Sequence, residues 1–64
     1  MQVNGKPYDH RPGLMLQALL AELQVDPRRV VVMQGDAIHR AGQIPDAPVA
    51  PDDVIEIVTM MQGG

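Results

Sequence analysis

Apolar and polar residues alternate along this chain with two different periodicities, one typical of helices and the other typical of strands. Four leucines recur at the spacing that places them on one face of a helix: Leu16, Leu19, Leu20 and Leu23. No Ser, Thr, Asp or Asn stands directly before this segment to cap it, and Asp26-Pro27 ends it. The pattern therefore predicts one amphipathic helix that is stabilised by packing of its leucine face more than by capping.

The remaining apolar segments are short and have the composition of strands. The first two flank Asn4-Gly5, a dipeptide suited to a tight hairpin turn because both residues tolerate positive φ. Pro7 has no N–H to donate, so we expect the second strand at a sheet edge. The predicted strands cover residues 1–3, 6–10, 30–33, 37–39 and 54–60.

The order of these elements predicts a single domain over residues 1–64. Two strands precede the helix and three follow it, so the first and last strands, if adjacent, must be parallel. This arrangement is an α+β fold of the β-grasp type, with a mixed sheet and one main helix packed on one face. The segment 41–53 contains three prolines, which exclude regular structure and leave an ordered loop or a loose arm.

Strand alternation assigns residues to the two faces of this sheet. Beneath the helix we expect a core of Leu16, Leu19, Leu20, Leu23, Val31, Met33, Ile55 and Ile57. The opposite face has no helix to cover it, and we expect it to present an apolar patch to partner proteins, made of Val30, Val32, Val58 and Met60.

The amino-acid composition excludes several kinds of functional site and partner. The 64 residues include no cysteine, which excludes disulfides, thiolate metal sites and a thiol nucleophile and fits a reducing cytoplasm. Eight acidic and five basic residues give a net charge of −3, and Tyr8 is the one aromatic residue, so nucleic acid is not an expected partner. No apolar run approaches the roughly 20 residues that cross a bilayer, so no membrane partner is expected either.

Other candidate sites are weak. His10 and His39 lack companion ligands at metal-binding spacing, so we expect no metal. Asp52-Asp53 directly follows Pro51, where acidic residues commonly shape a turn rather than act in catalysis.

The end of the chain is more informative. Gly63-Gly64 follows the last predicted strand almost directly, and the chain also contains Val3-Asn4-Gly5, the leucine helix, Asp26-Pro27-Arg28-Arg29 and Asp53 before the last strand. Together, over the whole chain, these features resemble the ThiS family of ubiquitin-like sulfur carriers. The turn Gln34-Gly35 and the tryptophan-free segment 41–51 differ from many members of that family.

The resemblance implies a carrier and not an enzyme, with no cofactor of its own. A ThiF-like adenylyltransferase would activate the carboxylate of Gly64, a sulfur donor protein would convert it to a thiocarboxylate, and a ThiG-like thiazole synthase would take the sulfur for thiamin. Gly63 is the necessary neighbour, because a narrow channel in a partner leaves no room for a Cβ. We expect this tail to be flexible in the free protein.

Two alternatives remain open at this level. A MoaD-like carrier or a carrier for tRNA thiolation would use the same chemistry in another pathway, whereas a non-catalytic β-grasp interaction module would bind through its open face and never use its tail. The sequence does not identify the adenylating enzyme or the sulfur donor, or decide whether the tail is conjugated to lysines.

Overall fold

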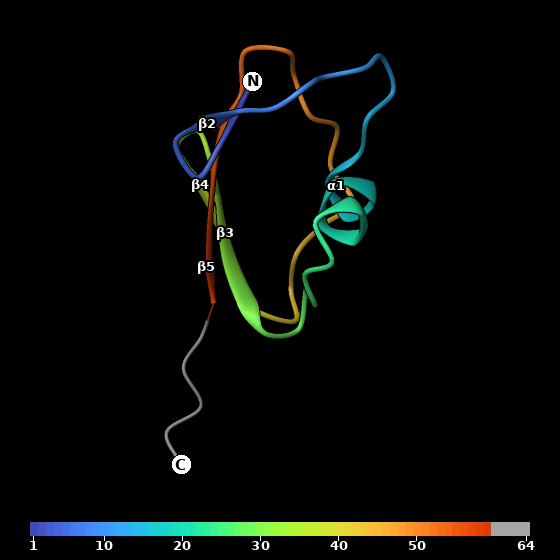
Figure 1. The fold of residues 1–64 in the computed structure, drawn as a ribbon. Coiled ribbons are helices and arrows are strands. Elements are labelled where there is room, and N and C mark those ends of the chain that lie inside the picture. Colours follow the sequence, from blue (N-terminus) through green and yellow to red (C-terminus); the bar gives the residue numbers. More distant parts are fainter. Residues whose placement is uncertain (60–64) are drawn as a thin grey trace.

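The computed structural model describes residues 1–59, which form a five-stranded mixed sheet with one helix on one side of it (Figure 1). The order of strands in the sheet is β2-β1-β5-β3-β4, in which β1 and β5 are parallel and the other neighbours antiparallel. This confirms the predicted β-grasp fold, with β2 at an edge. The elements are β1 (Gln2–Val3), β2 (Lys6–Pro7), α1 (Leu16–Glu22), β3 (Val30–Gln34), β4 (Ala37–His39) and β5 (Val54–Thr59).

The first hairpin is completed by a side chain that extends the sheet. Asn4 and Gly5 adopt φ angles of 53° and 79°, as the Asn-Gly pattern predicts. The Asn4 amide donates to the Ile55 carbonyl at 2.9 Å, and its Oδ1 accepts a hydrogen bond from the Ile57 N–H at 2.7 Å. In a continuing parallel ladder that N–H would bond to a backbone carbonyl, so the Asn4 side chain lengthens the pairing beyond the two residues of β1.

The helix is short, and its first amide groups are hydrogen-bonded to acceptors in another segment of the chain. Seven residues are too few for a stable isolated helix, and the N-cap residue, Met15, offers no side-chain hydrogen bond. Instead, the Leu16 amide donates to the Ala47 carbonyl at 2.8 Å and the Gln17 amide donates to Asp46 Oδ1 at 3.2 Å. The proline-rich segment 41–53 is thus an ordered loop on the helical side of the sheet (Figure 1), and it supplies acceptors that a local capping residue would otherwise provide.

The core lies between the sheet, the helix and this loop. Ile44 and Val49 of the loop are buried with the leucines of the helix and with residues of β1, β3 and β5. Leu23 and Ile57 are partly buried against this core, as their predicted positions require. The buried residues are Val3, Leu14, Leu16, Leu19, Leu20, Val30, Val32, Ile44, Val49 and Ile55.

The two faces of β3 are the reverse of the prediction. Val30 and Val32 are 2% and 0% exposed and point into the core, so their placement on the open face is wrong. Val31 and Met33 are half-buried and occupy the open face, so their placement in the core is also wrong. A strand that is apolar at every position has no alternation to read, and only its pairing with β5 fixes the faces. In that pairing Val32 lies opposite Ile57, on the helical side.

Candidate functional site

The residues predicted to react or to bind lie partly beyond the described chain. Gly63, Gly64 and Met60 fall outside residues 1–59. The last described element, β5, occupies the middle of the sheet between β1 and β3, where it is hydrogen-bonded on both sides. It ends at Thr59, opposite Val30 at the beginning of β3. The described part of the chain therefore ends in a firmly held strand at one end of the sheet.

Apolar side chains lie on the open face of the sheet around the exposed Glu56 of this strand. Val31 lies opposite Val58, and Met33 lies opposite Glu56 on one side and Ile38 on the other, so these side chains share one face. Val58 and Val54 are each 49% exposed and Ile38 is 67% exposed. Val58 thus lies on the open face as predicted. We call this set the open-face patch: Val31, Met33, Ile38, Val54 and Val58.

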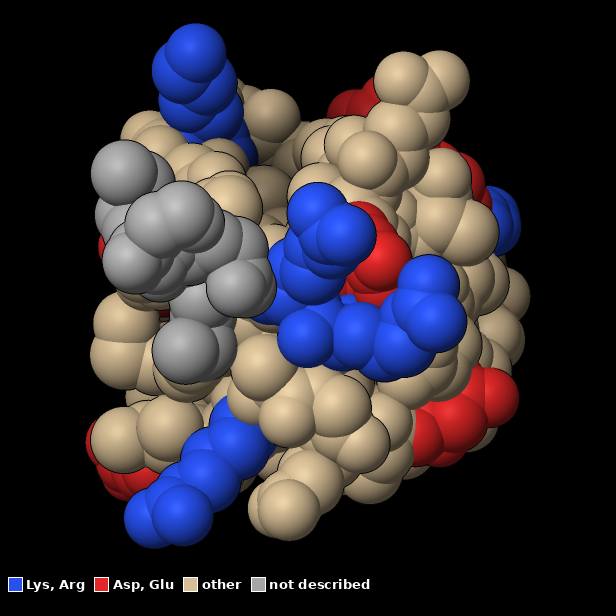
Figure 2. Space-filling view, turned by 90° about the horizontal axis from the view of Figure 1, so that it is seen from below, with Lys and Arg blue, Asp and Glu red and all other residues tan. Residues whose placement is uncertain are grey.

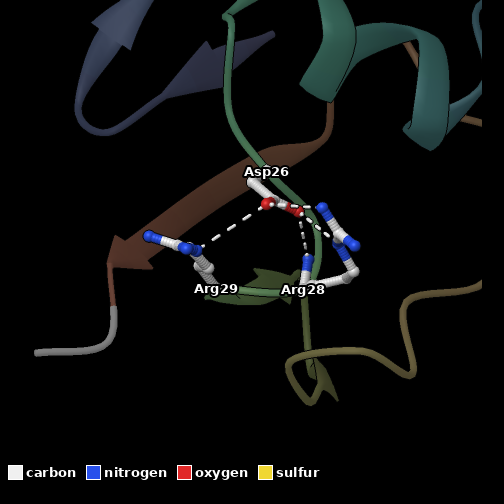
Figure 3. A network of polar contacts seen from close by, with 3 residues as sticks. All are labelled: Asp26, Arg28 and Arg29. Carbon is white, nitrogen blue, oxygen red and sulfur yellow. Dashed lines mark hydrogen bonds and ion pairs between the residues drawn. The ribbon is translucent and has the colours of Figure 1, made fainter. Parts of the chain in front are cut away.

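The end of the sheet where β5 ends is rich in basic side chains. Figure 2 shows several Lys and Arg residues at this end, with an acidic residue between two of them. Figure 3 shows the central group, in which Asp26 lies between Arg28 and Arg29. The Arg28 guanidinium donates to both Asp26 carboxylate oxygens, at 3.1 and 3.2 Å, and Arg29 Nε lies 3.8 Å from Oδ2.

This ion-pair group also shapes the turn before β3. The Arg28 amide donates to Asp26 Oδ1 at 2.9 Å, so the carboxylate accepts from the backbone as well as from the side chain. The hydrogen bond from the Arg28 guanidinium, followed by that from its amide, lowers the pKa of Asp26, and the same carboxylate raises the pKa of Arg28. Asp26 is therefore ionised at neutral pH and fixes the backbone that carries both arginines.

The two histidines and Asp53 form hydrogen bonds within the fold. His10 Nε2 lies 2.7 Å from the Val49 carbonyl, so the imidazole donates to the loop, and His39 Nε2 lies 3.2 Å from Gln34 Oε1. Asp53 Oδ2 accepts from the Ala50 amide at 2.8 Å and from the Gln34 side chain at 3.0 Å, which makes it a turn residue as expected. Within residues 1–59 no three His, Cys, Asp or Glu side chains are grouped to hold a metal ion.

The described residues thus present surfaces rather than an enclosed site. No pocket opens in the part of the chain that the structure describes, and no helix there is long and apolar enough to cross a membrane. The described residues therefore define a small protein of the β-grasp class with an open sheet face that carries exposed apolar side chains.

Comparison with known proteins identifies the family. The model of the ThiS family matches residues 1–64. The chain is also 36% identical over 64 residues to the sulfur carrier protein ThiS of Thermus thermophilus, with 97% of this chain and 95% of that protein covered. The chain belongs to the ThiS family of small sulfur carriers, which are not catalysts and work with partner enzymes.

Two parts of this surface depend on strand pairing that the sequence alone does not give. Ile38 joins the open-face patch because β4 pairs with β3 in a register that places it opposite Met33. The arginines come next to the end of β5 because β3 begins where β5 ends. In both cases the local sequence contains the residues but not their neighbours, which lie on other strands.

Proposed function

We propose that this protein carries sulfur as a thiocarboxylate on Gly64 and delivers it for the thiazole ring of thiamin. The observation that supports this most directly is the Gly63-Gly64 pair, which follows β5 within a few residues in a chain of the ThiS family. The relative from Thermus thermophilus, which carries the name of a sulfur carrier, is matched over nearly its whole length.

The proposed chemistry needs a partner because a carboxylate is a poor electrophile. In a ThiF-like adenylyltransferase, a carboxylate oxygen of Gly64 attacks the α-phosphorus of ATP and displaces pyrophosphate, which yields an acyl adenylate. A sulfur nucleophile from a donor protein then attacks the carbonyl carbon, and AMP leaves. When the nucleophile is a persulfide of the donor, a thiol attacks the donor's inner sulfur in the resulting acyl disulfide and forms a disulfide with the donor, which leaves the outer sulfur on Gly64 as a thiocarboxylate. A thiazole synthase takes the sulfur from this thiocarboxylate. Gly63 and Gly64 suit this handling because a residue without a Cβ fits a narrow channel.

The open-face patch is the proposed docking surface for these enzymes. It adjoins β5, so an enzyme that binds Val58 also lies next to the chain that follows Thr59. Burial of Val58, Val54 and Ile38 would remove from water the large apolar side chains that are most exposed among residues 1–59. Val31 and Met33 replace Val30 and Val32 in this proposal, and Met60 remains part of it. Because both enzymes need the same tail, we expect them to bind one at a time.

Mass spectrometry tests the reaction. The protein is incubated with a ThiF-like adenylating enzyme, ATP and a sulfide source, and it should gain the mass of one sulfur-for-oxygen exchange at its C-terminus. Deletion of Gly64, or extension by one residue, should abolish this gain. Circular dichroism should show an unchanged fold, because residues 1–59 contain the whole described core. Thiocarboxylation of the extended protein would exclude the Gly64 carboxylate as the site.

A matched pair of substitutions tests docking. Val58→Asp places a charge in the open-face patch and should weaken binding of each enzyme by a few kcal/mol if Val58 is buried in the complex. Ala18→Asp places the same charge on an exposed position of the helix, on the other side of the sheet, and should leave binding unchanged. Equal affinities for both variants in calorimetric titration would show that the enzymes bind elsewhere.

A further inference from the structure

Charged residues are segregated along the strand axis of this protein. β3 begins, β4 ends and β5 ends at one end of the sheet, because β3 is antiparallel to both of its neighbours. Arg28 and Arg29 directly precede β3, and Arg40 directly follows β4, so topology brings three of the five basic residues to this end. We call them the tail-side arginines.

The opposite end of the sheet is acidic. Asp36 follows β3 in its turn to β4, and Asp52 and Asp53 directly precede β5. The whole chain has a net charge of −3, so a group of three arginines is contrary to its overall charge. The positive end coincides with the end of β5, from which the chain continues toward Gly64.

Internal ion pairs do not neutralise the tail-side arginines. Asp26 is the partner of both Arg28 and Arg29, so one carboxylate faces two guanidinium groups. The side chains of Arg28 and Arg29 are 83% and 70% exposed, which leaves most of their donors open to solvent or to a partner. The side chain of Arg40 is also exposed and forms no ion pair with another residue of the described chain.

We propose that the tail-side arginines dock against a carboxylate-rich surface of the adenylating enzyme, around the opening that admits the tail. This inference rests on the proposed function, and it adds a second recognition element to the open-face patch. Guanidinium groups pair with carboxylates in a planar, two-pronged geometry, and exposed charges at the rim of an interface act mainly on the rate of association and on orientation. A charge located at the end of β5 orients the encounter so that the chain end approaches first.

The same observations favour a protein surface over a nucleic acid. A chain with eight acidic residues repels a polyanion as a whole, whereas an acidic patch of limited size can approach the positive end alone. Tyr8, the one aromatic residue, bonds to Glu22 near the helix end through its hydroxyl and is not part of the arginine group.

The test measures association rates with charge-altered variants. Binding of the protein to a ThiF-like adenylating enzyme is followed by stopped flow without ATP, at low and at high salt. Arg29→Glu and Arg40→Glu should each slow association at low salt by about tenfold, and this effect should shrink near 1 M salt, where charges are screened within about 3 Å. Asp26→Asn keeps an acceptor for the Arg28 amide, removes the compensating charge and should speed association.

Lys6→Glu is the matched control, because it changes the net charge by the same amount on β2, which β1 and β5 separate from β3. It should leave the rate close to that of the unaltered protein. Equal slowing by Lys6→Glu and Arg29→Glu would refute the proposal, since net charge alone would then explain the effect. Unchanged rates for Arg29→Glu and Arg40→Glu in proteins that melt normally would also refute it. The measurement is repeated with ATP, and an effect that appears only then would refute the proposal too, because it would assign the arginines to the nucleotide.

The two proposals fail in distinguishable ways. If the unaltered protein is adenylated but the arginine variants associate normally, only the docking role of the arginines is lost. If the unaltered protein is neither bound nor adenylated by the enzyme, the proposed function fails and the docking role fails with it.

Discussion

Truncation of neighbouring valines on β3 provides the sharpest test of the orientation of the sheet. Val32 is fully buried beneath the helix, whereas Val31 is half-buried on the open face. Val32→Ala removes two buried carbons, worth about 1.6 kcal/mol in transfer free energy at about 0.8 kcal/mol each, and leaves a cavity that raises the total to about 2 to 3 kcal/mol. Val31→Ala removes the same atoms from a surface that water already reaches and should cost about 1 kcal/mol or less.

The difference in unfolding free energy between the two variants measures the contribution of side-chain burial. Both substitutions exchange the same residues within one strand, so the loss of intrinsic strand preference is similar in each. A domain of this size is stabilised by about 3 to 10 kcal/mol, so the loss at Val32 is a large fraction of the total. At about 4 to 8 °C per kcal/mol, Val32→Ala should lower the melting temperature by roughly 10 to 20 °C.

Urea unfolding followed by far-ultraviolet circular dichroism is the suitable assay, because the chain has no tryptophan and a single tyrosine to report by fluorescence. The midpoint should fall clearly for Val32→Ala and slightly for Val31→Ala, with similar m-values. A loss at Val31 equal to or greater than the loss at Val32 would refute the register of β3 against β5 and would restore the face assignment that the sequence alone had favoured.

Two further predictions concern polar contacts. Asn4→Ala removes the acceptor for the Ile57 N–H and places a residue with a Cβ but no polar group at a φ of 53°, so thermal melts should show a loss of about 1 to 3 kcal/mol in the free energy of unfolding. Asn4→Asp keeps the acceptor and should lose less stability. Equal losses for the two variants would contradict the role of the side chain. Hydrogen bonds from the Arg11 guanidinium and, to a lesser extent, from the Tyr8 hydroxyl lower the pKa of Glu22. Ionised Glu22 therefore stabilises the fold above its unfolded pKa of about 4.3. This contribution is lost as pH falls through the lower pKa of Glu22 in the folded state. Glu22→Gln should therefore flatten the dependence of unfolding midpoints on pH in that acidic range, and an unchanged slope would show that the contact does not persist in solution.

The sequence by itself determined which elements form and in what order. The spacing of the four leucines, the Asn4-Gly5 turn and the runs of β-branched residues are local signals, and the helix and all five strands overlap the segments that these signals predict. The second strand is shorter than predicted, because it ends at Pro7 and not at residue 10. The mixed sheet also follows from the sequence, because a helix between the early and late strands allows their parallel pairing. Val58 was assigned to its proper face because Glu56, two residues earlier, marks the polar side of β5.

Only the tertiary structure decided which face of β3 is buried, how the helix begins and what surrounds the end of β5. Val30 and Val31 are chemically identical, so the choice between them depends on the register with another strand. The acceptors at the start of the helix come from Asp46 and Ala47, about 30 residues away in the sequence. The gathering of the tail-side arginines likewise depends on strands that run in opposite directions. Each of these features is a contact between distant segments, and no pattern within a single segment encodes it.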